Sequence, residues 1–340
     1  MSRPHVPGDV RDGTLVRVGK AARRVAAYRR GVLRAVTVPP TEDEVARAAA
    51  DVSAGAIGSV TVRPWPRGRS HHAYHLRAAD GQEYLFKVHR RPHPGRMRRF
   101  LHLAALLAAH DVPHPRLRWS DLDRRTLEVP YVIQEFVPGE DAGALAGQLS
   151  FADQQRVGAG LGTGLAALHA IEYVDTPTTW ATEFDDRIRT HAAECRSLDA
   201  LSGAEHEQVI AYYETRRGAL DGVQRTVTHD ELEPENLLLV RKVDGWHFAA
   251  LLDFERARGR DPVLDLAQLD LTTFPQWPAM ESTFATAYAD TARLGAGVTE
   301  RRELYAMYLL LAGIVYYRDN DAPQRELAAR DGLQRWLASH

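Results

Sequence analysis

Two short apolar runs joined by a tight turn constrain the fold of this chain more than any other feature. The runs at 237–240 and 248–252 have the length of β-strands, and Val243-Asp244-Gly245 between them is typical of a hairpin turn. The open ends of a hairpin lie side by side, so Asn236 and Asp253 are expected to be neighbours. An amide oxygen and a carboxylate are hard ligands, and this pair therefore predicts a Mg²⁺ site.

The loop before the hairpin carries a dense set of polar residues. It reads His229-Asp-Glu-Leu-Glu-Pro-Glu-Asn236 and resembles the catalytic loop of the aminoglycoside phosphotransferase and choline kinase family, commonly His-Gly-Asp-Leu-His-Pro-Gly-Asn. In that family a strand ending in Asp-Phe or Asp-Trp follows, as Asp253-Phe254 does here. Downstream, Gly259-Arg-Asp-Pro262 and Asp265-Leu-Ala267 look like the family's Gly-Asp-Pro and Asp-Leu-Ala signature.

The resemblance implies phosphoryl transfer, which depends on positioning and charge neutralisation more than on covalent help. Glu231 stands at the family's catalytic aspartate position and Asp230 at its glycine position. Glu231 is the favoured base because its spacing to Asn236 matches the family, and Asp230 is the alternative. Asn236 and Asp253 would hold Mg²⁺ against the nucleotide phosphates.

Three other polar residues of the loop are not expected to take part in catalysis. His229 is expected to hydrogen-bond within the loop rather than carry a proton. Glu233 and Glu235 are interpreted as solvated loop charges. These expectations leave Asp230 and Glu231 as the acids assigned to catalysis.

Lys87 is the main nucleotide-binding candidate of the first half. It lies within an apolar strand in a meander predicted over 59–89, and burying an ammonium group is costly unless it is paired. The resemblance makes it the lysine that contacts the α- and β-phosphates; the alternative is a lysine on an edge strand. Gly68 and Ser70 occupy the place of the family's phosphate-covering loop, although an ordinary hairpin loop would also suit them.

Two further features bear on the nucleotide. The strand ending in Gln134 and Phe136 resembles the interlobe hinge, whose backbone would hold the purine of ATP or GTP. The sequence departs from the family between Tyr84 and His110, where no acidic residue is available to pair with Lys87.

The predicted fold is α+β: a bilobal, protein-kinase-like architecture with a small antiparallel-sheet lobe and a larger, mainly helical lobe. Residues 1–54 are expected to form a helical extension, 55–137 the nucleotide-binding lobe and 138–340 the catalytic and acceptor-binding lobe. Helices are predicted at 154–171, across 183–221 and at 277–294 and 299–318 among others. Acidic residues of the inserted helices are candidates for binding a cationic acceptor: Glu183, Asp185, Asp186, Glu194, Asp199, Glu205 and Glu207.

Composition narrows the class of protein. The single cysteine, Cys195, excludes an internal disulfide. The sequence contains no run of about 18 apolar residues, so it predicts no membrane-spanning helix. The chain begins without an apolar signal core, so a cytoplasmic location is expected, with no nucleic-acid or membrane partner. The basic stretch 20–34 is expected to be a solvated face.

The expected activity is Mg²⁺-dependent transfer of the γ-phosphoryl group of ATP or GTP to a hydroxyl of a small molecule. An antibiotic or another natural product, including a cationic, aminoglycoside-like one, is the expected acceptor, with antibiotic resistance as the outcome. The alternative is a non-catalytic binding protein with a kinase fold. The missing acidic partner for Lys87 and the glutamate at the catalytic aspartate position motivate that alternative.

Overall fold

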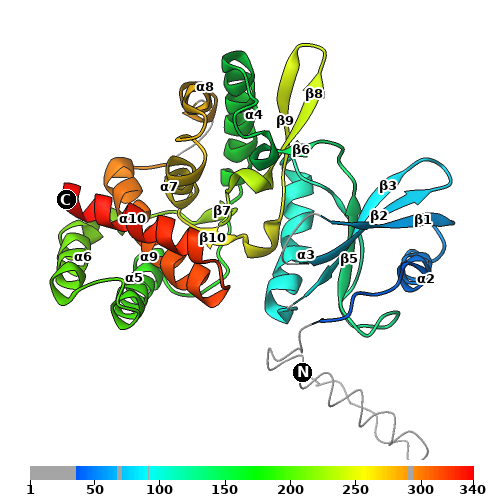
Figure 1. Cartoon of the computed structure of the whole chain (residues 1–340), viewed down its shortest axis with the longest axis horizontal. Helices are drawn as coiled ribbons and strands as arrows, with labels where there is room; N and C mark the ends of the chain where they lie inside the picture. The colour runs from blue at the N-terminus through cyan, green and yellow to red at the C-terminus, as the bar shows by residue number, and fades with distance from the viewer. Residues whose placement is uncertain (1–35, 67–70, 91, 290–293) are drawn as a thin grey trace, which may run out of the picture. The chain divides into compact units, whose positions relative to one another are not determined.

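The computed structural model describes residues 36–66, 71–90, 92–289 and 294–340 (Figure 1). The chain divides into two compact units, Met1–Arg98 with Leu117–Phe136, and Arg99–Arg116 with Val137–His340. The predicted basic stretch 20–34, Gly68 and Ser70 lie outside the described residues. Within the described ranges, every helix is too short or too polar to span a bilayer.

The first unit is built on an antiparallel sheet. Among the described residues its five strands follow the order β1-β2-β3-β5-β4. They are β1 (Val60–Trp65), β2 (His71–Ala78), β3 (Glu83–His89), β4 (Leu117–Asp121) and β5 (Tyr131–Glu135). Alternate side chains of β3 are buried, with Tyr84, Phe86 and Val88 entering the core. Phe86 stacks on Tyr131 of β5 with ring centroids 4.4 Å apart.

Helix α2 (Glu42–Val52) packs against β1 in this unit. Its first turn is closed by a capping box, in which the Thr41 side chain accepts from the Glu44 N–H and Glu44 accepts from the Thr41 N–H at 2.8 Å. These bonds satisfy two backbone donors that a helix start leaves open. The helix buries Val45, Ala48 and Ala49 in the same core as Phe86 and Tyr131.

The second unit is mainly helical. The final turns of α3 (Pro94–Ala109) belong to it, and the helices that follow are α4 (Phe151–His169), α5 (Trp180–Ser197), α6 (Gly203–Arg216), α7 (Val263–Thr272), α8 (Pro278–Ala289), α9 (Val298–Asp319) and α10 (Pro323–Ser339). Gly158 and Gly162 of α4 lie against α8, where an added Cβ would press on backbone carbonyl oxygens. These glycines allow α4 and α8 to approach closely.

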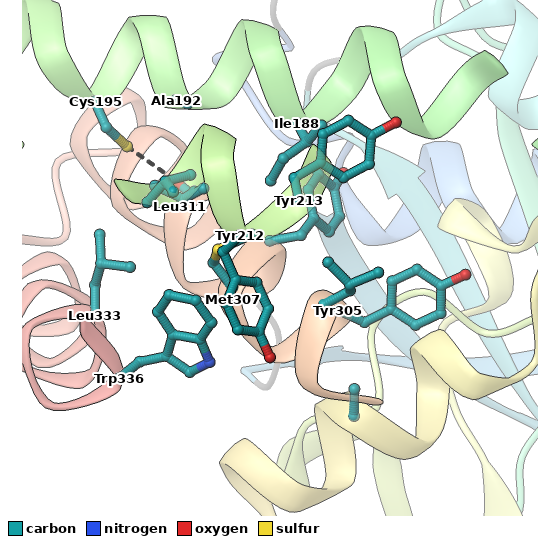
Figure 2. Packing of buried hydrophobic residues seen from close by; sticks show 14 of the residues in the cluster. Ile188, Ala192, Cys195, Tyr212, Tyr213, Tyr305, Met307, Leu311, Leu333 and Trp336 are labelled. Atoms are coloured by element: carbon teal, nitrogen blue, oxygen red, sulfur yellow. Dashed lines mark hydrogen bonds between the residues drawn. The ribbon is translucent and has the colours of Figure 1, made fainter. Parts of the chain in front are cut away.

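An apolar core joins α5, α6, α9 and α10 (Figure 2). Trp336 of α10 faces Tyr212 of α6 edge-on, with ring centroids 4.5 Å apart. Cys195 is buried in this core and donates to the Leu311 carbonyl at 3.4 Å, and burial raises the pKa of its thiol to about 12. Tyr213 of α6, which is 1% exposed, lies in the same core.

Short strands of the second unit carry the segments that matter most for function. The predicted hairpin is β8 (Leu237–Lys242) and β9 (Gly245–Leu251), and Gly245 after its turn has a φ of 124°. Strand β6 (Glu140–Asp141) adds to β8, while β7 (Thr226–Thr228) pairs with β10 (Arg258–Arg260). The polar loop 229–236 therefore runs from one small ladder to the other.

Candidate active site

The hairpin fixes where the loop ends. Leu237 pairs with Leu251, and the Leu252 N–H donates to the Asn236 carbonyl at 2.8 Å. Asn236 thus lies beside the start of the segment that contains Asp253, which has a left-handed backbone with φ 66° and ψ 57°. The side-chain Nδ2 of Asn236 donates to the Glu231 carbonyl at 2.8 Å. This bond turns the amide so that its Oδ1 is the atom left to accept or to coordinate.

Asp265 holds the beginning of the loop. Its carboxylate accepts from the His229 N–H at 2.6 Å and from the Asp230 N–H at 3.0 Å. The Nε2 of His169 lies 3.0 Å from the same carboxylate, and Tyr288 bonds to the other ring nitrogen at 2.6 Å. Burial alone would raise the pKa of Asp265, but these hydrogen bonds and the nearby histidines lower it. An ionised, fully buried carboxylate therefore fixes the loop backbone.

His229 is itself buried and structural, in agreement with its sequence interpretation. Its ring Nε2 lies 2.7 Å from the Leu252 carbonyl, a geometry in which the nitrogen donates. Burial lowers the pKa of His229, so the ring is neutral near pH 7. The bond ties the start of the loop to the end of the hairpin.

Glu231 differs from the other acids of the loop. Its side chain is partly exposed, and burial raises its pKa to about 8. The positive charge of Arg256 opposes this rise, and the carboxylates of Asp253 and Glu233 add to it. Within the described part of the chain, the Glu231 carboxylate has no hydrogen bond or ion pair. It is the loop acid most available to accept a proton.

The carboxylate of Asp230 forms an ion pair with an arginine. Nη1 of Arg260 lies 2.6 Å from both carboxylate oxygens of Asp230, and both side chains are 7% exposed. The backbone of Asp230 has a φ of 69°, a conformation that favours glycine. Asp230, the alternative base in the sequence interpretation, is therefore committed to a buried ion pair.

The expectation of solvated charges was wrong for Glu233, whose side chain is 20% exposed, whereas Glu235 is 50% exposed. Arg325 of α10 contacts both of them, with Nη1 at 2.6 Å from Glu233 and Nη2 at 2.5 Å from Glu235. Tyr317 of α9 also donates to Glu233 at 3.0 Å. No local sequence pattern predicts these contacts, because the partners lie about ninety positions apart in the chain.

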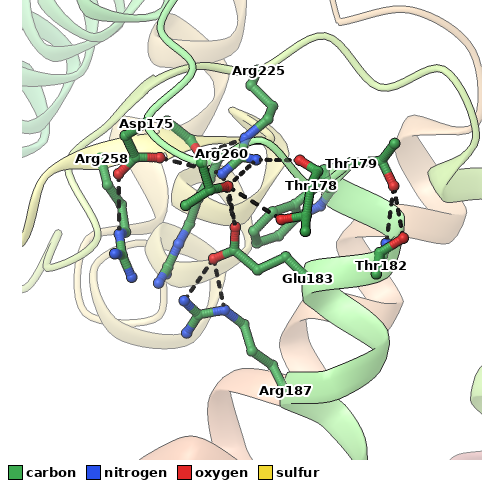
Figure 3. Close-up of polar contacts among 12 residues, drawn as sticks. Asp175, Thr178, Thr179, Thr182, Glu183, Arg187, Arg225, Arg258 and Arg260 are labelled. Carbon is green, nitrogen blue, oxygen red and sulfur yellow. Dashed lines mark hydrogen bonds and ion pairs between the residues drawn. The ribbon is translucent and has the colours of Figure 1, made fainter.

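A second buried arginine supports the ladder that carries Arg260 (Figure 3). Arg225, just before β7, donates to the Gly259 carbonyl at 2.8 Å and to the Thr178 carbonyl at 2.9 Å. It also bonds to Glu183 of α5 at 2.8 Å. An added Cβ at Gly259 would collide with the carbonyl oxygen of Tyr173, so only glycine suits this position.

Three of the seven acids proposed for a cationic acceptor are engaged in contacts within the helices. Glu183 pairs with Arg187 at 2.7 Å as well as with Arg225. Asp185 pairs with Arg189 at 3.1 Å, and Glu205 closes the capping box of α6. These carboxylates are therefore part of the helical scaffold rather than open binding groups.

The nucleotide candidates of the first unit lie on central strands. Lys87 is partly exposed on β3, between Ala73 of β2 and Val132 of β5, so the edge-strand alternative was wrong. Gln134 is buried on β5. The Phe136 N–H donates to the Glu83 carbonyl at 3.0 Å, which extends the ladder between β3 and β5 to the end of the strand.

Comparisons with known proteins identify the family. Residues 61–304 match the model of the phosphotransferase enzyme family, APH. Because this match covers more than half of the chain, the chain belongs to that family, and the prediction of a small-molecule phosphotransferase is confirmed. A search of curated proteins found no match.

Solved structures share the fold at low sequence identity. Macrolide 2'-phosphotransferase MphH from Brachybacterium faecium is 21% identical, with 87% of this chain and 98% of that chain covered and a TM-score of 0.62. Aminoglycoside phosphotransferase APH(4)-Ia is 14% identical, covering 88% and 99%, with a TM-score of 0.63. The GDP complex of aminoglycoside 2'-phosphotransferase-IIIa is 12% identical, covering 87% and 99%, with a TM-score of 0.61. The predicted α+β, kinase-like fold is therefore confirmed.

Proposed function

We propose that the protein transfers the γ-phosphoryl group of ATP or GTP to a hydroxyl of an antibiotic or another natural product, with Mg²⁺. The main support is the position of Glu231, whose carboxylate has no partner among the residues that the structure describes and which lies in the same loop as Asn236, whose Oδ1 is left to coordinate. A related fold has been solved with GDP, and another similar structure is a macrolide phosphotransferase. A nucleotide donor suits the predicted cytoplasmic location, and phosphorylation of an antibiotic would give resistance.

Asn236 and Asp253 have the oxygen donors that Mg²⁺ prefers, so the residues present fit the ion. Asn236 is held by three hydrogen bonds: its side chain and its backbone N–H each donate one, and its backbone carbonyl accepts one. When bound, Mg²⁺ would neutralise charge on the nucleotide phosphates. Lys87, Gln134 and Phe136 remain the proposed nucleotide-binding residues, with Gly68 and Ser70 proposed for the phosphate-covering loop.

In the proposed reaction the acceptor hydroxyl oxygen bonds to the γ-phosphorus. The bond between that phosphorus and the bridging oxygen of the β-phosphate breaks, and the nucleoside diphosphate leaves. The hydroxyl proton passes to the Glu231 carboxylate. The pKa of Glu231, raised to about 8, makes its ionised carboxylate a stronger proton acceptor than an ordinary glutamate, and this base form predominates above that pH.

Binding and turnover test this proposal separately. Thermal shift with ATP or GTP, with and without Mg²⁺, should show a metal-dependent stabilisation. Mass spectrometry of reactions with a panel of macrolides, aminoglycosides and other hydroxylated antibiotics should show the addition of one phosphoryl group. Glu231→Gln should lower kcat by about 10²- to 10⁴-fold. Glu281→Gln, which changes an exposed acid of α8 in the same way, should leave kcat unchanged.

The outcomes separate the two candidate functions. An absence of nucleotide binding would exclude the proposed reaction. Nucleotide binding without turnover on the whole panel, and with no effect of Glu231→Gln, would favour a non-catalytic binding protein. Mg²⁺-dependent turnover that requires Glu231 would establish the phosphotransferase.

A further inference from the structure

The other acids of the loop 229–236 are each held by an arginine from a distant segment. Asp230 precedes it and pairs with Arg260 of β10, while Glu233 and Glu235 follow it and pair with Arg325 of α10. We propose that Arg260 and Arg325 are positioning residues, which hold the loop from both sides and engage its other acids so that Glu231 takes the proton. This inference rests on the proposed function.

The contact between Asp230 and Arg260 has the geometry of a compensating pair. The resembling family has glycine at the position of Asp230, and its Gly-Asp-Pro signature has glycine directly before the aspartate, where this chain has Arg260. Both positions therefore carry a charged side chain, the charges are opposite, and the groups meet at 2.6 Å. A buried ion is tolerated when its partner is present and strongly disfavoured when the partner is removed.

The pair also fixes the residue next to Glu231 in two ways. The Asp230 N–H is bound by Asp265, and its carboxylate is bound by Arg260. Arg260 lies 5.8 Å from the ring of Trp180, which is 2% exposed and gives the guanidinium a rigid neighbour. Because Glu231 is bonded directly to Asp230, the direction of its side chain depends on this arrangement.

Arg325 acts on the other side of Glu231. One guanidinium bridges two carboxylates, and Tyr317 adds a hydrogen bond to one of them. The Asn236 N–H also donates to the Glu233 carbonyl at 2.9 Å, so a fixed Glu233 fixes the turn that leads to Asn236. Arg325 thus links the C-terminal helix α10 to the end of the loop.

A cycle of variants tests the pair at Asp230. Arg260→Gly and Asp230→Gly should each lower kcat about tenfold or more, with little change in the nucleotide KM. The double variant Asp230→Gly with Arg260→Gly should recover most of the lost kcat, because both charges are removed together. Arg260→Lys should keep part of the activity. Independent, multiplying effects in the double variant would overturn the proposal.

Variants of Arg325 provide a second test. This residue is more exposed than Arg260, so its variants should fold. Arg325→Gln should lower kcat about threefold to tenfold without changing the nucleotide KM. Adding Glu233→Gln and Glu235→Gln should restore kcat, since the uncompensated charges then disappear. Arg335→Gln, in the same helix, is the matched control and should have no effect. Unchanged kcat in Arg325→Gln would overturn the proposed role of α10.

Hydrogen–deuterium exchange separates this proposal from the proposed function. In Arg260→Gly and Arg325→Gln, peptides covering 229–236 should exchange faster than in the wild type, and the compensated variants should return to the wild-type rate. Peptides of α4 should not change. Unchanged loop exchange would refute positioning even in an active enzyme. A wild-type protein without phosphoryl transfer would refute the proposed reaction even if the loop exchange followed this pattern.

Discussion

Replacing Glu231 with glutamine should stabilise the metal-free and nucleotide-free protein, and more so as the pH rises. Burial raises the pKa of Glu231 from its ordinary 4.5 to about 8. Between these values the folded protein keeps a proton that the unfolded chain has released. The free energy of unfolding therefore falls as the pH rises from 4.5 through 8, and the contribution of the protonated group is complete only below 4.5. Glutamine has no proton to lose and avoids this decrease.

The size of the effect follows from the pKa. A change from 4.5 to about 8 corresponds to about 5 kcal/mol, because each tenfold change in acid dissociation is worth about 1.4 kcal/mol. The side chain is partly exposed, so solvent screening reduces the cost of its charge. We therefore expect Glu231→Gln to gain about 2–3 kcal/mol over the wild type at about pH 8 to 9.

Urea unfolding of the wild type, Glu231→Gln and Glu207→Gln at a series of pH values measures this difference. The gap between Glu231→Gln and the wild type should be near zero at about pH 4 and grow to its full size by about pH 9. The Glu207→Gln control should follow the wild type throughout. A gap that stays constant over this range would refute the reasoning, because it would mean that Glu231 ionises as a solvated glutamate does.

Three other residues give separate predictions. Asp153→Asn should lose about 2 kcal/mol of unfolding free energy at neutral pH, because hydrogen bonds from Ser150 and others lower the pKa of Asp153 from 3.8 to about 2. Urea unfolding should show this loss becoming smaller as the pH falls toward 2. Lys87→Ala should raise the Kd for ATP at least tenfold in calorimetry, whereas Lys242→Ala, at the exposed end of β8, should not. Asp265→Asn should speed hydrogen exchange of the loop amides, because it removes the charge that binds two of them.

The local parts of the site could be predicted from sequence, and the distant ones could not. The hairpin could be predicted because strand length and turn chemistry are local properties of the sequence. Its closure places Asn236 beside Leu252. A capping box is a local pattern of the same kind, as the contact of Thr41 with Glu44 at the start of α2 illustrates. The contact of Arg325 with Glu233 crosses 92 positions and depends on how α10 packs, which no local pattern encodes. The interpretation of Glu233 as a solvated charge was wrong for this reason.

A glutamate in place of the family's aspartate explains why such distant contacts would matter here. The additional methylene of Glu231 adds one rotatable bond, so its carboxylate loses more conformational freedom when it is held at one place. A loop whose backbone is bound by Asp265, and whose neighbouring acids are bound by Arg260 and Arg325, limits the positions from which that longer side chain extends. The same contacts stop Asp230 from competing for the proton. We therefore expect Glu231 and the contacts that hold its loop to depend on each other. Substituting Glu231 alone, or the residues that hold the loop alone, would leave the carboxylate misplaced.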